Sequence, residues 1–281
     1  MKTLVQKIYI EPHNSFAFRL YRTPDFETNW HIHEEFELIL ITEGSGTVMI
    51  GDYVGDYFAG DLYFIAANLP HWFRKSDAKM IGAAKVMHAK PDLFNDFLQQ
   101  FPEMKNIQSL LLKKDAVRIE KKLKTDIINL LAQIESQKGF QRLLPLFQIL
   151  NGLGNSKNLI LLTQDFISLN NNINPFIEKI IDYSFKHFLE PITLAQVSSV
   201  LEMSVPNFCR FFKRNIKKSY FNFLQELRIG HACKLLNSTK KPILEICYES
   251  GYNSWAHFSK QFKQVKSTTP SMYRKQFEGN N

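Results

Sequence analysis

The feature of this sequence that most restricts its fold is a degenerate repeat in the last third of the chain. The segment SVPNFCRFFKRN, which begins at Ser204, aligns with SWAHFSKQFKQV, which begins at Ser254, at an offset of 50 residues. Each serine can cap a helix, because its hydroxyl accepts a hydrogen bond from an otherwise unpaired backbone N–H. Aromatic side chains four residues apart then share one helix face. We expect the following to be core residues: Phe208, Phe211, Phe212, Phe258 and Phe262.

A shorter apolar segment precedes each copy, TLAQVSSVLEM in the first and PILEICYESGY in the second. Two short helices joined by a tight turn, the second of them amphipathic and basic, describe a helix-turn-helix motif. One such match is common among helical hairpins, whereas two in tandem are much more specific. The connecting segment 219–237 is predicted to be a single helix, and 19 residues span roughly 28 Å. Neighbouring major-groove faces lie about 34 Å apart, so one rigid helix could hold two readers in adjacent grooves.

The charge of the chain is concentrated in the same region. Residues 176–281 contain 16 basic and 8 acidic side chains, whereas residues 1–175 contain 19 of each, so the net charge of +8 lies entirely in the C-terminal part. This asymmetry favours a polyanionic partner, and with the two motifs it predicts double-stranded DNA. A basic surface that is merely solvated is the alternative.

Side chains that face away from the predicted cores are the candidate DNA contacts. Asn pairs with adenine and Arg with guanine through two hydrogen bonds each, whereas cations near the end of a helix are better placed for phosphates. Among the latter we count Lys266. The predicted DNA-binding residues are Pro206, Asn207, Arg210, Lys213, Arg214, Trp255, Ala256, His257, Lys260 and Lys263.

The N-terminal part has a different pattern. From residue 7 to about 90, short apolar runs are broken by EGSG, IGD, VGD and AGD, which is typical of an antiparallel barrel or sandwich. FELILI and TVMI flank TEGSG and are predicted to form a hairpin. From 92 to about 169 the pattern is helical, including one helix that contains Val117 and Ile134 and another that Pro145 should kink or break. The polar segment 168–174 is a predicted linker.

Three histidines and a glutamate stand out in the N-terminal part: His31, His33, Glu37 and His71. Alternate residues of a strand share a face, so the first three should line one side together with Ile39. Imidazole and carboxylate groups suit Fe, Mn, Ni or Zn. Trp30 and Trp72 adjoin two of these histidines and could form an apolar wall for a sugar-like effector, or could be ordinary core aromatics.

The C-terminal residues 176–276 resemble the DNA-binding domain of the AraC/XylS family of transcription regulators. The resemblance is carried by LRIGHACKLL (227–236), EICYESGYNSWAHFSKQFK (245–263) and TPSMYR (269–274). This chain departs from the family at Glu202, Lys217 and Ser267, where glycine is usual, and retains Gly251. Because glycine is favoured where φ is positive, each replacement should cost roughly 1 kcal/mol.

The spacing from His31 through His33 and Glu37 to Gly44, followed by Gly60 and a Pro-His pair at 70–71, resembles the cupin β-barrel family. The second half of that motif is only partly present around 66–68. The resemblance implies that the three histidines and the glutamate are metal ligands. Three interpretations stay open: a catalytic metallocupin, a sensory barrel that holds a metal, and a sensory barrel whose polar groups bind a small molecule or one another.

The combined prediction is an α+β protein. An N-terminal antiparallel, cupin-like β-barrel (1–90) senses a ligand, a helical linker layer (91–169) serves dimerisation, and an all-α DNA-binding domain (170–281) carries the two motifs. We expect a cytoplasmic, non-enzymatic, homodimeric regulator of promoter DNA, with activation as the expected mode and RNA polymerase as a candidate partner. No cofactor is required, although a divalent metal would suit the cupin-like site. The alternatives are a metal-dependent enzyme with a basic helical tail and an architectural DNA binder with a vestigial barrel.

The three cysteines (Cys209, Cys233 and Cys247) are odd in number and show no CxxC spacing, which predicts neither a disulfide framework nor a zinc finger. The N-terminus lacks the apolar run of a signal peptide, and the chain has no run of roughly 18 apolar residues that would predict a membrane span.

Overall fold

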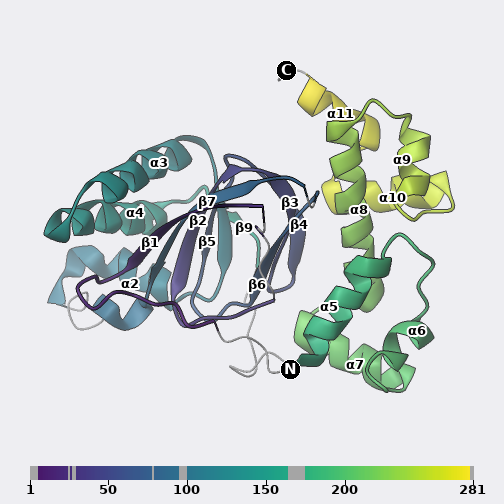
Figure 1. Cartoon of the computed structure of the whole chain (residues 1–281), viewed down its shortest axis with the longest axis horizontal. Coiled ribbons are helices and arrows are strands. Elements are labelled where there is room, and N and C mark those ends of the chain that lie inside the picture. Colours follow the sequence, from purple (N-terminus) through teal and green to yellow (C-terminus); the bar gives the residue numbers. More distant parts are fainter. Residues whose placement is uncertain are drawn as a thin grey trace. The chain divides into compact units, whose positions relative to one another are not determined.

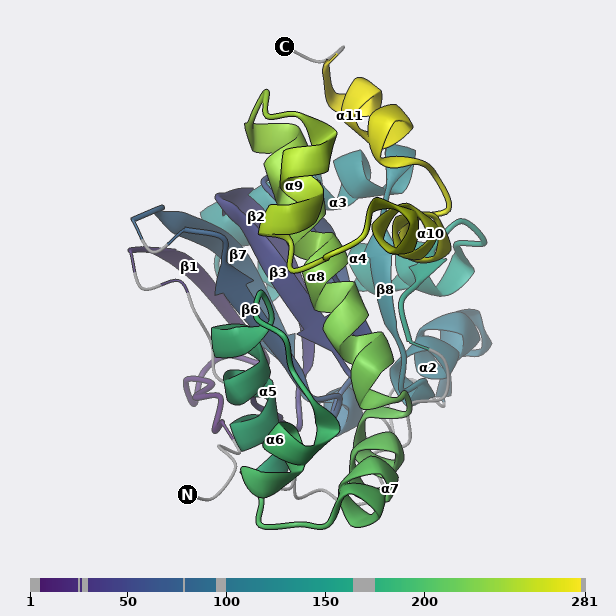
Figure 2. The same ribbon diagram turned by 90° about the vertical axis from the view of Figure 1, so that its right-hand side faces the viewer.

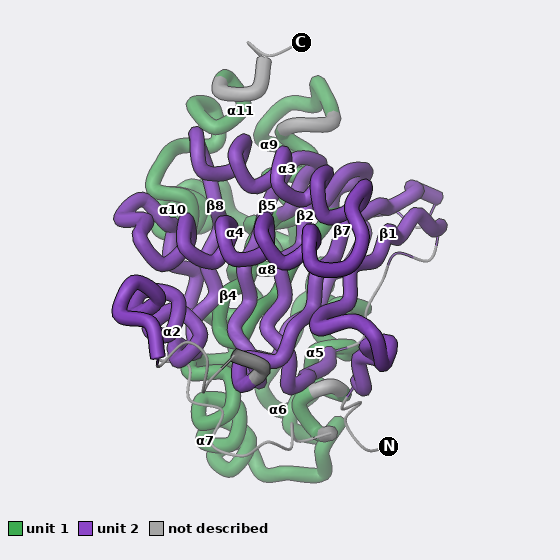
Figure 3. The backbone as a smooth tube through the Cα atoms, turned by 90° about the vertical axis from the view of Figure 1, so that its left-hand side faces the viewer, with its two compact units in different colours: residues 1–3, 46–56, 174–281 green, residues 4–45, 57–173 purple. Residues whose placement is uncertain are grey.

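The computed structural model of the chain describes residues 6–24, 26, 30–77, 79–94, 100–163 and 175–278 (Figure 1). The chain divides into two compact units (Figure 3): unit 1 comprises residues 1–3, 46–56 and 174–281, and unit 2 comprises residues 4–45 and 57–173. The predicted linker 168–174 lies outside the described residues. Among the described helices, none combines the length and apolar character needed to cross a membrane.

The β-strands form two sheets. A six-stranded sheet has the order β1-β7-β2-β5-β8-β9, and a three-stranded sheet has the order β4-β3-β6. The pairings within the larger sheet are antiparallel, as predicted. The strand bounds are β1 Ala17–Thr23, β2 Phe36–Glu43, β3 Ser45–Ile50, β4 Tyr53–Phe58, β5 Leu62–Ile65, β6 His71–Lys75, β7 Gly82–Ala89, β8 Ala116–Ile119 and β9 Ile160–Leu161.

One face of the larger sheet is covered by helices. Short 3-10 turns occur at η1 Pro91–Phe94, η2 Pro102–Met104 and η3 Gly139–Arg142. The helices are α2 Lys105–Leu112, α3 Lys121–Ser136 and α4 Leu143–Asn155, and Figure 1 shows α3 and α4 lying along the sheet. Phe36, Leu38 and Leu40 of β2 are buried in this core with apolar residues of the helices. Since neighbouring strand residues point to opposite faces, Glu37 lies on the other face of β2.

Two local predictions for this region were wrong. β2 pairs with β5 and β7, whereas β3 lies in the other sheet, so the FELILI–TVMI hairpin does not form. Instead the chain crosses between sheets at Gly44, whose φ of 93° suits glycine. Val117 lies in strand β8, because the four-residue run AVRI pairs with β5 before α3 begins at Lys121. Pro145 lies in the first turn of α4, where a missing N–H costs little, and the 3-10 turn η3 ends directly before this helix.

The C-terminal helices follow the prediction closely. Figure 2 shows α8 connecting the α5–α7 group to the α9–α11 group. The long connecting helix begins one residue after the predicted start, with Ser219 accepting a hydrogen bond from the Asn222 N–H at its N-terminus. The bounds are α5 Pro175–His187, α6 Leu194–Ser199, α7 Val205–Ile216, α8 Tyr220–Ser238, α9 Ile243–Glu249, α10 Trp255–Lys266 and α11 Pro270–Glu278.

The five phenylalanines of the repeat are all buried, each at most 8% exposed. Phe258 and Phe262 pack in a core with Ile246 and Cys247 of α9. In the first copy, the rings of Phe212 and Phe223 are 5.5 Å apart between centroids, which joins α7 to α8. Helices α7 and α10 therefore each have an aromatic inner face, as the sequence pattern predicted.

The backbone is left-handed at the three positions where the resembled family usually has glycine and this chain has another residue. Glu202, Lys217 and Ser267 have φ values of 55°, 61° and 56°, in the region that disfavours residues with a Cβ. Gly251 has a φ of 78°, and a Cβ there would lie 3.0 Å from the Leu189 carbonyl oxygen. The substitutions have kept the turn geometry and placed it under local strain.

Candidate effector site and DNA interface

Three segments of unit 2 bring the predicted histidines and glutamate together. Glu37 is the second residue of β2, and His71 is the first residue of β6. His31 and His71 form an isolated antiparallel bridge, in which each backbone N–H donates to the other residue's carbonyl oxygen. His33 lies between His31 and β2, and its carbonyl oxygen accepts from the Asn68 N–H over 2.9 Å. The four side chains thus converge from two distant parts of the sequence, as predicted.

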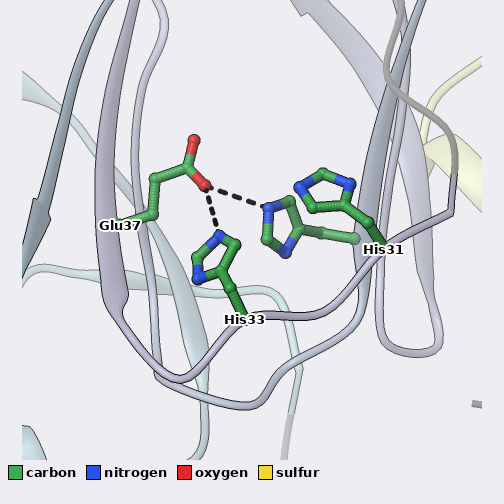
Figure 4. Close-up of side chains that lie close together, drawn as sticks. His31, His33 and Glu37 are labelled. Carbon is green, nitrogen blue, oxygen red and sulfur yellow. Dashed lines mark hydrogen bonds and ion pairs between the residues drawn. The ribbon is translucent and has the colours of Figure 1, made fainter. Parts of the chain in front are cut away.

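The side chains meet at a single carboxylate oxygen. Glu37 Oε2 lies 3.1 Å from His33 Nε2 and 3.0 Å from His71 Nε2. Figure 4 shows His33 and Glu37 facing one another, with His31 beside them. One ligand atom from each of the four residues lies within 4.8 Å of the others, and all four residues are buried. Three imidazole nitrogens and one carboxylate oxygen form a donor set that suits a first-row transition metal.

Backbone carbonyls fix the tautomer of two of these histidines. His33 Nδ1 lies 2.9 Å from the Glu35 carbonyl oxygen, and His71 Nδ1 lies 2.8 Å from the Leu69 carbonyl oxygen. A carbonyl oxygen only accepts hydrogen bonds, so both Nδ1 atoms carry the proton. In the neutral rings the Nε2 lone pairs therefore point toward the Glu37 carboxylate, which offers them no proton. A cation between them would remove this repulsion, and an Nδ1–H donating to a carbonyl is the usual arrangement of metal-binding histidines.

Without a metal, the electrostatics of the site describe protonated imidazole rings beside an ionised carboxylate. Burial alone would raise the pKa of Glu37, but the neighbouring charges of His71 and His88 outweigh it and hold the pKa well below its ordinary value. Burial lowers the pKa of His33, whereas the hydrogen bond and charge of Glu37 raise it, and the net shift is upward. The site therefore favours positive charge around an ionised carboxylate.

His88 belongs to the same cluster and was missed in the sequence. Its Nε2 lies 3.4 Å from Glu37 Oε2, and the residue is 5% exposed. It is in β7, directly opposite Glu37 in the β2–β7 register. No motif contains it, and the strand pairing is the signal that would have found it.

The two tryptophans that adjoin His31 and His71 in the sequence are both buried, Trp30 at 3% and Trp72 at 6% exposed. Buried indole rings fit the alternative of core aromatics as well as that of an effector wall. Trp30 Nε1 has no hydrogen-bond acceptor among the described residues. A buried donor of this kind is available to a polar ligand.

The predicted DNA-contacting side chains are exposed on α7 and α10. Within α7, Arg210 donates from Nη2 to Asn207 Oδ1 over 2.6 Å, so the two predicted base readers contact each other. Trp255 is 42% exposed at the first turn of α10. The predicted contacts that the structure leaves exposed are Pro206, Asn207, Arg210, Lys213, Arg214, Trp255, Ala256, His257, Lys260 and Lys263.

Two details of these helices differ from the predictions. Ser254 caps α10 by accepting from the His257 N–H, whereas the Ser204 side chain makes no capping hydrogen bond. Lys266, predicted to reach phosphates, is bound within unit 1 by Asp56, with 3.0 Å between Nζ and Oδ2. Burial would lower the pKa of Lys266, but the charge of Asp56 outweighs it and raises the pKa above its ordinary value. This lysine is therefore taken up by a protein carboxylate in the structure.

Comparisons with known proteins agree with this architecture. An AraC-like ligand binding domain model matches residues 13–149, and a helix-turn-helix domain model matches residues 197–276. The uncharacterized HTH-type transcriptional regulator YdeC of Bacillus subtilis is 24% identical over 255 residues, which cover 87% of this chain and 85% of that protein.

The HTH-type transcriptional activator RhaR of Mannheimia succiniciproducens is 23% identical over 251 residues, which cover 88% of this chain and 87% of that protein. Among solved structures, ToxT of Vibrio cholerae O395 matches 94% of this chain and 99% of its own with 16% identity and a TM-score of 0.38. The two domain models together span both parts of the chain, in the order that the fold shows. The chain belongs to the AraC family of transcriptional regulators, with a ligand-binding domain followed by a helix-turn-helix DNA-binding domain.

Proposed function

We propose that this regulator senses a small molecule through a divalent metal held by His31, His33, Glu37 and His71. The observation that carries the proposal is the buried cluster itself, in which one ligand atom from each of three histidines and a glutamate lies within 4.8 Å of the others, while backbone carbonyls hold Nδ1 of His33 and His71. A bound metal would supply a Lewis-acidic centre at which an oxygen-bearing effector can be recognised. The chain's own residues hold the ligands in place and shield the site from water, since all four are buried.

The proposed role of this site is sensory rather than catalytic. Support comes from the relatives, which are transcriptional regulators of nearly the same length. The effector we propose is a polyhydroxylated molecule such as a sugar, because oxygen donors suit the metal and the buried Trp30 N–H is free to donate. A ligand can shift the regulator between arrangements only through its different affinity for each.

Sequence-specific binding is proposed to reside in the exposed residues of α7 and α10. Asn207 and Arg210 would read bases in one groove segment, and Trp255, Ala256, His257 and Lys260 in the next. Lys213, Arg214 and Lys263 would bind phosphates. The aromatic inner faces of both helices support this division, because they leave only the polar faces for DNA.

We further propose a cytoplasmic homodimer that activates transcription, with RNA polymerase as a contact. Support for a second subunit comes from the start of the α4 region, where Phe140 is 70% exposed and Leu144 is 47% exposed. Large exposed apolar side chains that lie close together are typical of interaction surfaces.

The experiment combines metal analysis with DNA binding by the full-length protein. Elemental analysis would be followed by removal of metal with a chelator and titration with Zn²⁺, and affinity would be measured for a DNA ligand selected from a random-sequence pool. We expect wild-type protein to bind about one Zn²⁺ per chain and His33→Ala to lose tight Zn²⁺ binding. We also expect the DNA affinity of metal-free protein to differ from that of Zn²⁺-loaded protein. If wild-type protein binds no metal, the proposed metal site is wrong. If no DNA sequence can be selected, the proposed base contacts of α7 and α10 are wrong.

A further inference from the structure

We propose that His88 is a positioning residue of the metal site, which donates a hydrogen bond from Nε2 to the Glu37 carboxylate and does not itself bind the metal. This inference rests on the proposed metal site and adds a residue that neither the sequence motif nor the cluster of four ligands contains.

The place of His88 follows from the strand register. Glu37 of β2 and His88 of β7 are direct partners in the antiparallel ladder, and side chains of such partners project from the same face of a sheet. The ring of His88 is 5.1 Å from that of His33 between centroids, with the planes at 80°. The strand register thus places the side chain of His88 on the same face of the sheet as Glu37, beside the site.

The hydrogen-bonding pattern separates His88 from the other histidines around Glu37. In His33 and His71, a backbone carbonyl holds the proton on Nδ1 and leaves Nε2 as a lone pair. His88 Nδ1 is buried and has no hydrogen-bond partner among the described residues, and the residue as a whole is 5% exposed. Nothing therefore holds its proton on Nδ1, and the nearby Glu37 Oε2, which only accepts, favours the proton on Nε2.

This difference assigns different tasks to chemically identical rings. A lone pair can bind a metal, whereas a ring nitrogen that carries a proton cannot. His33 and His71 are therefore equipped as ligands, and His88 is equipped as a donor to the carboxylate ligand. Carboxylates that bind metals are commonly held by such donors, and the loss of one lowers metal affinity about 10- to 100-fold.

The test compares two substitutions in the full-length protein. Gln can place an amide N–H near the position of the imidazole Nε2, whereas Leu fills the space without a donor. We expect His88→Leu to weaken Zn²⁺ binding about 10- to 100-fold and His88→Gln to stay within about threefold of wild type, measured by competition with a chromophoric chelator. The visible spectrum of Co²⁺-loaded His88→Gln should keep the wild-type bands, because the ligand set is unchanged.

Each other outcome overturns the proposal. Equal loss in the Gln and Leu variants, with a changed Co²⁺ spectrum, would make His88 a direct ligand. Unchanged affinity in His88→Leu would remove it from the site. If wild-type protein binds no Zn²⁺, the proposed metal site is wrong. This result differs from a failure of the role of His88, because it is seen in wild-type protein before any substitution is made.

Two controls guard against misfolding. His231→Leu changes a half-buried histidine of α8, outside the site, and should leave Zn²⁺ affinity unchanged. Should His88→Leu fail to fold by circular dichroism, His88→Asn replaces it: its shorter amide reaches the Nδ1 position but not the Nε2 position. His88→Asn should then lose affinity as specified for Leu, while His88→Gln retains it.

Discussion

Arg210 and Asn207 lie one helical turn apart on α7, and the Arg210 guanidinium donates to the Asn207 amide oxygen over 2.6 Å. The amide thereby restrains the longer side chain before DNA is present. An arginine held in this way loses less conformational freedom when it binds the edge of a guanine. The contact also occupies the acceptor of Asn207, so the arginine is the stronger candidate for reading a base.

Removal of this arginine should relax specificity more than affinity for DNA in general. We expect Arg210→Ala to lower the preference for the selected site by about 1–3 kcal/mol, whereas Lys263→Ala should weaken selected and random DNA alike. Fluorescence anisotropy with both DNAs measures the two effects separately. If the Arg210 variant lost the same factor on both DNAs, it would be a phosphate contact.

DNA binding should depend steeply on salt. Lys213, Arg214 and Lys263 are the proposed phosphate contacts of each chain, so the logarithm of affinity should fall with the logarithm of salt with a slope of about −3 per bound chain. Titrations between about 50 and 200 mM KCl would measure it. Lys263→Ala should make the slope shallower by about one, and a slope near zero would argue against binding through the basic domain.

Glycine should stabilise the protein at the strained turns. Lys217 and Ser267 have φ values of 61° and 56° at the ends of α7 and α10. We expect Lys217→Gly and Ser267→Gly each to raise the free energy of unfolding by up to about 1 kcal/mol. Chemical denaturation would measure the change.

The matched control for these turns lies inside the preceding helix. Lys213→Gly should destabilise the protein by about 1 kcal/mol, because its backbone is helical. Gly251→Ala should also destabilise, since its Cβ would meet the Leu189 carbonyl at 3.0 Å. Stabilisation of all four variants would show that the effect is unrelated to φ.

The ion pair of Asp56 and Lys266 should matter for stability through its burial. Asp56 and Lys266 have side chains that are 8% and 21% exposed. Removing one partner leaves the other charge buried without a counterion. Asp56→Asn should therefore lower the free energy of unfolding by about 3 kcal/mol, and the double variant with Lys266→Met should recover much of that loss. Additive losses in a double-mutant cycle would show that the two side chains do not interact.

The histidine–glutamate cluster should make the metal-free protein sensitive to pH in both directions. The pKa of Glu37 is lowered, so its contribution is present above the unfolded value near 4.5 and is lost as pH falls through the folded pKa. The pKa of His33 is raised, so its contribution is present below 6.5 and is lost as pH rises through the folded pKa.

We therefore expect metal-free protein to be most stable between these limits, and Glu37→Gln to flatten the alkaline side of the profile. Unfolding followed by circular dichroism from pH 4 to 9 in a chelating buffer would measure it, with His231→Leu as the control outside the cluster. If the pH profile of Glu37→Gln were unchanged, the Glu37 carboxylate would not be the cause of the raised pKa of His33.

The C-terminal fold could be predicted because its signals are local. Ser219 and Ser254 mark helix starts, and the buried phenylalanines recur at helical spacing, so that each segment alone specifies its element. The cluster of His31, His33 and Glu37 was also found, since the three residues fall within seven positions of one another. His71 lies 34 residues beyond Glu37 in the sequence, and it was assigned to the cluster through the resemblance to the cupin motif.

The errors arose where a partner distant in sequence decides the structure. AVRI is too short to show a strand period, and its pairing with β5 makes it a strand. The turn residues around Gly44 indicate a sharp change of direction but do not say whether the next strand returns to the same sheet. His88 is 51 positions beyond Glu37, and only the register of β2 and β7 places it there. Lys266 follows Phe262 by four residues and so lies near the buried face of α10, where Asp56, which is distant in sequence, binds it.

The continuity of α8 has a consequence for the DNA that this regulator can recognise. Its first half packs on α7 through Phe223, and its second half packs in the core of α9 and α10 through Ala232 and Cys233. One inserted residue in the middle would turn the second half by about 100° and advance it by about 1.5 Å. If α7 and α10 each contact one groove segment, as proposed, the length of α8 sets the distance and the rotational phase between the two DNA segments. A relative with a longer or shorter α8 would then recognise DNA segments at a different spacing.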